Sequence, residues 1–386
     1  MRAGDRVLLL APHPDDETLA AGGLLQQAVA AGAAVRVVYA TDGDNNPWAQ
    51  RAEERRWQLD AADRVRWACV RRREALAALT TLGVARADVR FLGWPDQGLT
   101  SLVVNDGDRA VVTLLRAVAG DPPTIVLAPT PLDLHPDHSA LALLVRLALR
   151  RLVPAMCRPL VLEYLVHRRR GSLGAVAPTW HVRLSAEQID RKRAAIRAHA
   201  SQLRLRPRAL LAYAAGREQF FAPRRPGVDA GAAAHPIRAA TIDGDTLRLR
   251  VRQRPHLGAF GATTLYLAIE RREGTARWRA VLPCALASIG LVRLVCGVRV
   301  ACGLSESGAE GRELRLPLAM FRDARAVFAK LERRFGFFDE AGWCELAVRG
   351  YPRTHVFTAR RDGARPLAPA RQPPDRRRRY GRVKFV

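Results

Sequence analysis

The stretch Ala11-Pro12-His13-Pro14-Asp15-Asp16-Glu17 gathers a histidine and two adjacent aspartates on one short turn. Residues 6–10 before it form a mostly apolar run, as buried parallel strands do, and the residues from position 17 onward have the composition of a helix start. The turn is therefore expected at the carboxyl end of a strand, where open α/β sheets place their ligands. A helix cap would explain one carboxylate there, but not this group of three side chains.

A second turn of the same kind follows another strand-like run at residues 124–129. It reads His135-Pro136-Asp137-His138, and residues 139–145 then begin a second apolar helix. Two strand-end loops that each carry His-Pro-Asp can face each other across a parallel sheet. His13 and Asp16 could hold a Zn²⁺ ion, and a zinc site that does chemistry needs a third protein ligand and an open position. The paired turns therefore predict a metal site.

Together the two motifs, residues 13–17 and 135–138, resemble the zinc-dependent N-deacetylases of the PIG-L/LmbE family. The resemblance covers roughly residues 1–220. Members of this family remove acyl groups from N-acetylglucosamine on phosphatidylinositol, from mycothiol precursors, from glycopeptide antibiotics and from other sugars. The resemblance implies the same class of reaction for this chain, with Zn²⁺ as cofactor and an amino-sugar or glycoconjugate substrate.

The resemblance also implies a role for each motif residue. The metal ligands would be His13, Asp16 and His138. The catalytic residues would be Asp15 as general base, His135 as the group that polarises the amide carbonyl, and Asp137 as the side chain that orients His135. Two histidines and a carboxylate also accept Fe(II) or Co(II), so zinc is the favoured metal among several.

Two further residues match substrate contacts in the family. Arg73 corresponds to an arginine that touches substrate, and Asp96, in Trp94-Pro95-Asp96, corresponds to an aspartate that contacts sugar hydroxyls. An exposed helix charge is the alternative interpretation of Arg73, and a turn residue is the alternative for Asp96. The chain departs from the pattern at Asp133, where some sugar deacetylases carry a tyrosine, so substrate binding at that position cannot be carried over.

The order of apolar runs predicts the fold class of residues 1–225, the deacetylase-like domain. Strand-like and helix-like segments alternate, which requires a Rossmann-like parallel sheet with helices on both faces. The strands are expected near residues 6–12, 34–40, 88–93, 124–129 and 159–165, and the helices near residues 17–31, 50–83, 106–119 and 138–152.

The pattern changes after residue 227. Short runs of period two and a hairpin around Asp243-Gly244 predict a β-rich, sandwich-like accessory domain over residues 230–365, with one helix near 321–334. Clustered histidines and carboxylates are lacking there, so we expect no catalytic residue, and a truncation ending near Gly227 should keep activity. Residues 366–386 form a basic tail rich in proline and arginine.

The number and distribution of basic residues indicate which binding partners to expect. The formal net charge is +26, yet only three of the 63 basic residues are lysines, and the arginines are scattered through every segment, so nucleic acid is not the expected partner. Residues 168–170 and 376–379 are arginine runs that could touch anionic lipid or a phosphorylated glycan.

Three features of the sequence indicate a cytoplasmic protein. The cysteines lack framework spacing, the start does not resemble a signal peptide, and there is no long uncharged apolar window. Such a protein could lie peripherally at the inner face of the membrane.

Two function classes follow. The first is a zinc-dependent hydrolase, a metal-dependent N-deacetylase that cleaves a linear amide and removes an N-acyl group, expected to be N-acetyl, from a GlcNAc-type amino sugar or glycoconjugate. The second is a basic binding protein, on nucleic acid or an anionic surface, whose deacetylase-like domain is inactive. The intact set of motif residues favours the first class, because a decayed site would have lost some of them.

Overall fold

The structure is a computed structural model. It describes residues 1–119, 121–152, 158–167, 177–223, 235–252, 263–282, 289–294, 296–306, 311–333, 338–339 and 341–346. The chain divides into one compact unit, Met1–Pro352, and a second, Arg353–Val386. The predicted basic tail and the arginine run at 168–170 lie outside the described residues, so their expected contacts with anionic groups stay predictions.

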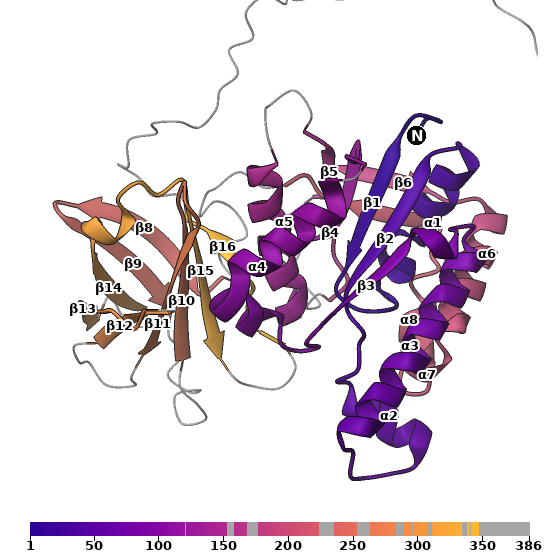
Figure 1. The fold of residues 1–386 in the computed structure, drawn as a ribbon, viewed down its shortest axis with the longest axis horizontal. Coiled ribbons are helices and arrows are strands. Elements are labelled where there is room, and N and C mark those ends of the chain that lie inside the picture. Colours follow the sequence, from indigo (N-terminus) through magenta and orange to yellow (C-terminus); the bar gives the residue numbers. More distant parts are fainter. Residues whose placement is uncertain are drawn as a thin grey trace, which may run out of the picture. The chain divides into compact units, whose positions relative to one another are not determined.

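A parallel five-stranded sheet forms the N-terminal part, as predicted (Figure 1). Its strand order is β3-β2-β1-β4-β5. The central strands are buried on both faces, which explains why their sequences are continuously apolar. The strands are β1 (Arg6–Ala11), β2 (Ala34–Thr41), β3 (Val89–Trp94), β4 (Ile125–Pro129) and β5 (Leu160–Tyr164).

Helices cover both faces of this sheet, which confirms the predicted α/β class. Alternate residues of β1 enter the two cores: Leu9 packs with helices of one face and Leu8 with helices of the other. The first face carries α1 (Asp16–Ala30), α3 (Ala61–Thr81) and α6 (Ala186–Ala198), and the second carries α4 (Leu99–Ala119) and α5 (Pro136–Arg151).

Smaller elements complete this part of the chain. The segment predicted as one helix over 50–83 is two helices, α2 (Pro47–Glu54) and α3, because Arg55 ends α2 in a left-handed conformation and Asp60 starts α3 with a capping box. The others are the 3₁₀ turn Arg86–Asp88, the helices α7 (Ala200–Leu203) and α8 (Pro207–Leu211), and the antiparallel pair β6 (Trp180–Arg183) and β7 (Arg217–Phe220).

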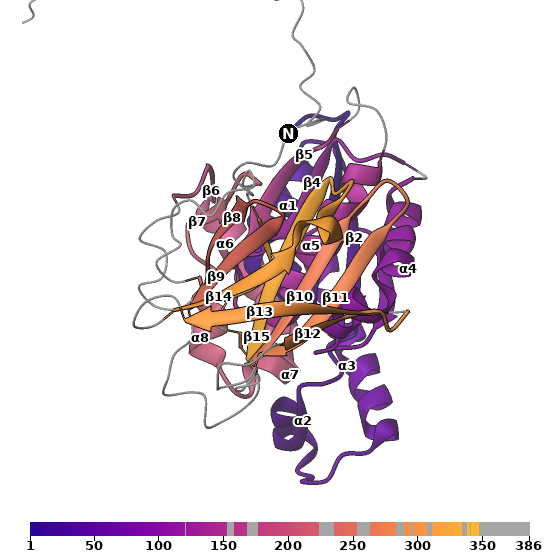
Figure 2. The same cartoon turned by 90° about the vertical axis from the view of Figure 1, so that its left-hand side faces the viewer.

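The C-terminal module is β-rich, as predicted, and its described strands form one antiparallel sheet that curves around a shared apolar core (Figure 2). Asp243 and Gly244 lie at the turn between its first two strands, where the sequence predicts a hairpin. The strand order is β16-β15-β10-β11-β12-β13-β14-β9-β8. The strands are β8 (Ile237–Asp243), β9 (Thr246–Arg252), β10 (Thr263–Glu270), β11 (Thr275–Leu282), β12 (Ile289–Arg293), β13 (Arg299–Glu306), β14 (Gly311–Pro317), β15 (Ala326–Arg333) and β16 (Cys344–Glu345).

The helix predicted near 321–334 is wrong. A 3₁₀ turn at Leu318–Phe321 precedes the strand β15, which pairs with β10 along its whole length. Val327, Ala329 and Leu331 enter the core of the module, while Phe328 faces the core that α4 and α5 share. A strand buried on both faces loses the period-two pattern by which strands are recognised, and tertiary packing then overrides local helix propensity.

The β-rich sheet and the α/β part share an apolar core. Tyr266, Phe328 and Trp343 of the module belong to the same buried cluster as the inner faces of α4 and α5. Asp108 of α4 adds ion pairs at this junction, with Arg277 of β11 and Arg151 of α5. The two parts therefore pack as neighbouring layers within Met1–Pro352, and the domain boundary near 225–230 stays a prediction.

Candidate metal centre

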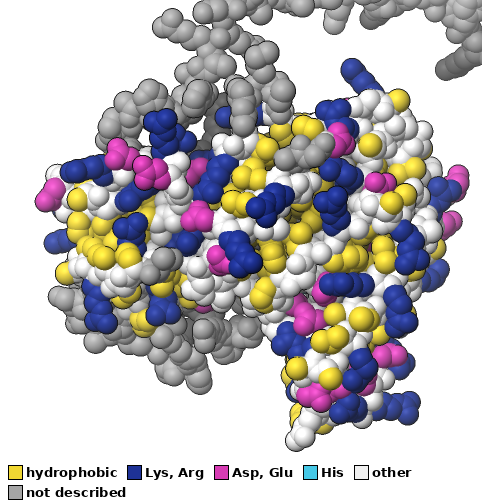
Figure 3. Space-filling model, viewed as in Figure 1, with side chains coloured by type: hydrophobic (Ala, Val, Ile, Leu, Met, Phe, Trp, Pro, Cys, Tyr) yellow, Lys and Arg dark blue, Asp and Glu magenta, His cyan; other side chains and the backbone are white. Residues whose placement is uncertain are grey.

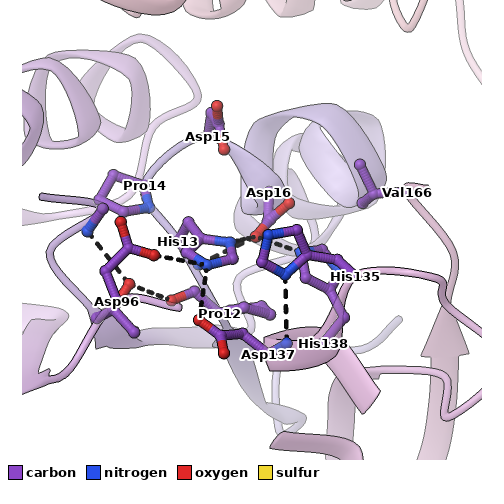
Figure 4. Close-up of polar contacts among 12 residues, drawn as sticks. Pro12, His13, Pro14, Asp15, Asp16, Asp96, His135, Asp137, His138 and Val166 are labelled. Carbon is purple, nitrogen blue, oxygen red and sulfur yellow. Dashed lines mark hydrogen bonds and ion pairs between the residues drawn. The ribbon is translucent and has the colours of Figure 1, made fainter. Parts of the chain in front are cut away.

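The two His-Pro-Asp turns meet at one edge of the parallel sheet. The strands β1 and β4 are adjacent, with Val7 paired to Ile125 and Leu9 to Leu127, so the turns that follow them lie side by side. His13 comes from the first turn, and His135 caps the N-terminus of α5 in the second. The ring centroid of His13 lies 4.7 Å from that of His135 and 5.3 Å from that of His138 (Figure 4). The predicted convergence of the motifs is therefore observed.

Asp16 lies between the two predicted histidine ligands, at donor-atom distances that suit a shared cation. Asp16 Oδ2 is 3.3 Å from Nδ1 of His13 and 3.2 Å from Nε2 of His138. Metal–ligand distances of about 2.0–2.1 Å in a tetrahedral zinc site place neighbouring donor atoms about 3.3–3.4 Å apart. All three residues are buried, with 8%, 1% and 0% of His13, Asp16 and His138 exposed.

The buried carboxylates around these histidines also favour binding of a cation. Burial alone would raise the pKa of Asp16, but the charge of His138 and a hydrogen bond from His13 hold it well below its usual range. Burial would likewise lower the pKa of His138, but the carboxylates of Asp133 and Asp16 raise it to about 10. The negative charge of these carboxylates stabilises a proton on the buried histidine. The same negative charge would favour a divalent cation in the proton's place.

In each of the two predicted histidine ligands, the ring nitrogen that does not face Asp16 contacts another carboxylate. Nε2 of His13 lies 3.3 Å from Asp137 Oδ2 and 3.2 Å from Asp96 Oδ1, and Nδ1 of His138 lies 3.0 Å from Asp133 Oδ2. Histidines that bind metals commonly make such a contact through the nitrogen that is not a ligand, which fixes the ring's orientation. The residues present therefore fit a divalent cation.

The groups of described residues whose ligand atoms all lie mutually close are other combinations than His13, Asp16 and His138. Three groups have ligand atoms within 4.8 Å of one another: His13 with His135 and His138, Asp133 with His138 and His167, and His13 with Asp96 and Asp137. The choice of His13, Asp16 and His138 thus stays a proposal about which of these neighbouring atoms bind the metal.

Asp15 differs from Asp16 and the histidines in its backbone conformation, its partner and its pKa. It caps the start of α1 with a φ of 127°, a strained conformation for a residue other than glycine, and such strain concentrates at functional sites. Its Oδ2 lies 3.2 Å from Nη2 of Arg71. Burial raises the pKa of Asp15 to about 6, against the opposing charge of Arg71. Figure 4 shows Asp15 outside the dashed contacts that join the histidines, so its carboxylate is not engaged with them.

His135 and Asp137 are arranged differently from the expectation. The side chain of Asp137 does not hold His135. It accepts hydrogen bonds from the backbone N–H groups of Gln97 (2.7 Å) and Leu99 (3.0 Å) and contacts His13. His135 is held instead by the backbone, because its Nδ1 accepts the N–H of Asp137 at 3.2 Å. Burial and the charges of the neighbouring histidines keep the pKa of His135 well below its usual range, so its ring is neutral.

Comparisons with known proteins find relatives over the part of the chain that carries this site. The family described as PIG-L: GlcNAc-PI de-N-acetylase matches residues 8–149. The 1D-myo-inositol 2-acetamido-2-deoxy-alpha-D-glucopyranoside deacetylase of Mycolicibacterium vanbaalenii is 32% identical over 206 residues, which are 48% of this chain and 69% of that protein. The chain belongs to the PIG-L family.

Other relatives match over shorter stretches. The deacetylase of the same name from Tsukamurella paurometabola is 35% identical over 141 residues, 34% of this chain and 46% of that protein, so the chain spans about half the length of several such relatives. Among solved structures, the N,N'-diacetylchitobiose deacetylase of Pyrococcus horikoshii is 24% identical, with 51% of this chain and 70% of that one covered. Its TM-score of 0.40 is too low to support an argument about the site.

Of the two residues predicted to contact substrate in this PIG-L chain, Asp96 lies at the site and Arg73 does not. Arg73 is exposed, and its Nε donates to the carbonyl of Cys69 in its own helix. The structure instead brings Arg71 to the site, where the residue is 4% exposed and its guanidinium donates to the carbonyl of Gly43. Asp96 is at the site as expected, but it contacts His13 and accepts the N–H of Asn45 at 2.6 Å; a contact with sugar hydroxyls stays a prediction.

The sequence analysis did not identify three residues of the site, Arg71, Asp133 and His167, although a pattern in the sequence pointed to Arg71. Arg71 lies four residues before Ala75, which is buried together with Ala78 and Leu79, so the helical period already placed Arg71 on the inner face. Asp133 was considered only as a departure from the family pattern. It is fully buried, contacts His138, and accepts the N–H groups of Val166 and His167, each at 3.0 Å. The strand β5 that positions the last two residues is distant in sequence, so no local pattern predicts this role.

Proposed function

We propose that this chain is a zinc-dependent N-deacetylase that removes an N-acyl group, such as N-acetyl, from an amino sugar or glycoconjugate of the N-acetylglucosamine type. The observation that carries the proposal is the convergence of His13, Asp16 and His138 beside Asp15, whose carboxylate pairs with Arg71 and does not contact the histidines, in a chain of the PIG-L family. The names of the matching relatives, deacetylases of a 2-acetamido sugar linked to inositol, support this substrate class.

Zinc fits the donor set of two imidazoles and one carboxylate, and it would be held by His13, Asp16 and His138. When bound, the ion would supply Lewis-acid activation of the amide carbonyl and of a water molecule. The contacts of His13 with Asp137 and of His138 with Asp133 would keep both rings in the orientation that binding requires.

Asp15 would act as the general base. It lies next to Asp16, so its carboxylate can reach the attacking water without taking part in metal binding. A carboxyl with a pKa of about 6 is ionised at neutral pH and can accept a proton from that water. The same carboxyl, once protonated, can give the proton to the departing nitrogen, which turns a poor leaving group into an amine.

His135 would stabilise the carbonyl oxygen as negative charge develops on it. Because Nδ1 of His135 accepts the backbone N–H of Asp137, the proton of the neutral ring lies on Nε2. That Nε2–H is the donor that can point at the carbonyl oxygen, so a neutral imidazole is sufficient and no imidazolium is needed. Donors of this kind commonly contribute several kcal/mol to the transition state.

The alternative, a basic binding protein without activity, finds less support. On the face shown in Figure 3, Lys and Arg side chains are spread among apolar and acidic ones and do not form a stripe that could follow a polyanion. Among the described helices, none combines the length and apolar character that crossing a membrane requires.

The proposal is tested with a panel of N-acetylated amino sugars, free and linked to inositol, by measuring released acetate and new amine together. Zinc-loaded protein should release both in equal amounts. Asp15→Asn should keep bound zinc and lose about 100- to 10 000-fold in kcat, because it loses the proton acceptor but no ligand. Asp42→Asn, at the end of the neighbouring strand, is the matched control and should stay active. Equal rates for Asp15→Asn and wild type would show that the general base is wrongly assigned.

A further inference from the structure

One segment of the β-rich module is attached to the turn that carries His135. The backbone N–H of Asp339 donates to the carbonyl of Leu134 at 3.0 Å. The carboxylate of Asp339 pairs with Nζ of Lys330 at 2.6 Å, and Lys330 also donates to Thr100 of α4 at 2.9 Å. Lys330 is fully buried. The attachment therefore links β15, α4 and the second His-Pro-Asp turn through buried polar contacts.

Close packing fixes the same segment a few residues later. At Gly342 there is no room for a side chain, because a Cβ atom there would overlap the carbonyl of Pro131 and the side chain of Ser139. Trp343 is 3% exposed and packs in the core that α5 shares with the module. The backbone at Gly342 thus packs against the turn at Pro131 and against the first turn of α5 at Ser139.

Phe338 brings an apolar ring to the candidate site. Its ring centroid lies 6.0 Å from that of His135 and 5.4 Å from that of His167, and 42% of the residue is exposed. The opposite side of the site is polar, since Asp96 and Asn45 come from the loops after β3 and β2. Sugar hydroxyls need polar partners such as these, whereas a phenyl ring has no hydrogen-bonding group and packs against apolar parts of a substrate, of which an acyl chain is one.

We propose that Phe338 forms an apolar wall on the acyl side of the substrate, and that the enzyme therefore prefers N-acyl groups longer than acetyl. The inference rests on the proposed function, in which His135 donates to the carbonyl oxygen. The acyl chain begins at that carbonyl carbon, so it lies next to the ring that contacts His135. Phe338 lies outside residues 8–149, the part that matches the PIG-L family, so this preference would be a property that the β-rich module adds.

The test compares kcat/KM for N-acetyl-, N-butyryl- and N-hexanoylglucosamine. Wild type should prefer the hexanoyl substrate to the acetyl one. Phe338→Ala should lower the hexanoyl-to-acetyl ratio by about tenfold, the scale of discrimination that a few buried methylenes give, and Phe338→Leu should retain most of it. Trp57→Ala removes an aromatic ring that is 72% exposed on the surface, and should leave the ratio unchanged. Thermal melting checks that each variant is folded.

The outcomes separate this inference from the proposed function. If wild type hydrolyses N-acetylglucosamine but shows no preference for longer acyl groups, the inference is overturned and the proposed function stands. If Phe338→Ala lowers kcat/KM equally for all three substrates, the ring contacts the sugar and the acyl assignment is overturned. If wild type releases no acyl group from any amino sugar, the proposed function fails and this inference fails with it.

Discussion

Arg71 forms an ion pair with Asp15, and this pair gives the site a testable dependence on pH. The positive charge of Arg71 lowers the pKa of Asp15, which burial raises to about 6. The base is active when deprotonated, so kcat should fall as the pH drops below about 6. Arg71→Gln removes the charge and should move this acidic limb to higher pH, while Arg71→Lys keeps the charge and should leave it close to the wild-type position. Identical limbs in all three proteins would exclude Asp15 as the titrating group.

Asp133 should set the affinity for metal without being a ligand. Its carboxylate contacts Nδ1 of His138 and is itself fixed by backbone N–H groups, so it holds the ring that Asp16 faces. We expect Asp133→Asn to weaken zinc binding by about 10- to 100-fold, as loss of such a support generally does. Competition with a chelating dye measures this. Asp121→Asn, whose carboxylate pairs with Arg6 at the surface, is the control. Unchanged affinity in Asp133→Asn would exclude this role.

At the scale of elements, the close contact between the β-rich module and the turn before α5 depends on the absence of a side chain at Gly342. Gly342→Ala would force a methyl group into the carbonyl of Pro131 and the side chain of Ser139. Overpacking of this kind costs about 1–3 kcal/mol, so the melting temperature should fall by several degrees. Gly290→Ala, in β12, meets no atom within 4 Å and should melt like wild type. Equal melting temperatures for the two variants would show that the segment can move away from the turn.

The elements also show what the sequence could and could not predict. The strands β1 and β4 and the turns after them were predictable, because buried parallel strands are continuously apolar and the chemical residues directly follow them. The strand β15 was not, since both of its faces are buried and its residues have no alternation. Nor could the partners of Asp137 be foreseen, because Gln97 and Leu99 lie about 40 positions earlier in the chain.

At the scale of the whole molecule, the shared core changes the expectation for a truncated protein. Removal of residues after about 227 would uncover the apolar surface of α4 and α5 that packs against Tyr266, Phe328 and Trp343. We therefore expect the fragment to aggregate or to bind a hydrophobic dye, instead of remaining a well-behaved active domain. Size-exclusion chromatography of the fragment beside the full chain decides this. A monomeric fragment with full activity would restore the view that the first domain is independent.

The most direct test of the central claim is metal-dependent hydrolysis measured on one preparation. Protein stripped with a chelator should release no acetate from an N-acetylated amino sugar, and addition of one equivalent of zinc should restore release. His138→Ala should bind zinc poorly and stay inactive after the same addition, because it lacks a ligand. Acetate release that continues in the stripped protein, or that zinc restores equally in His138→Ala, would contradict the assignment of His13, Asp16 and His138 as a catalytic metal site.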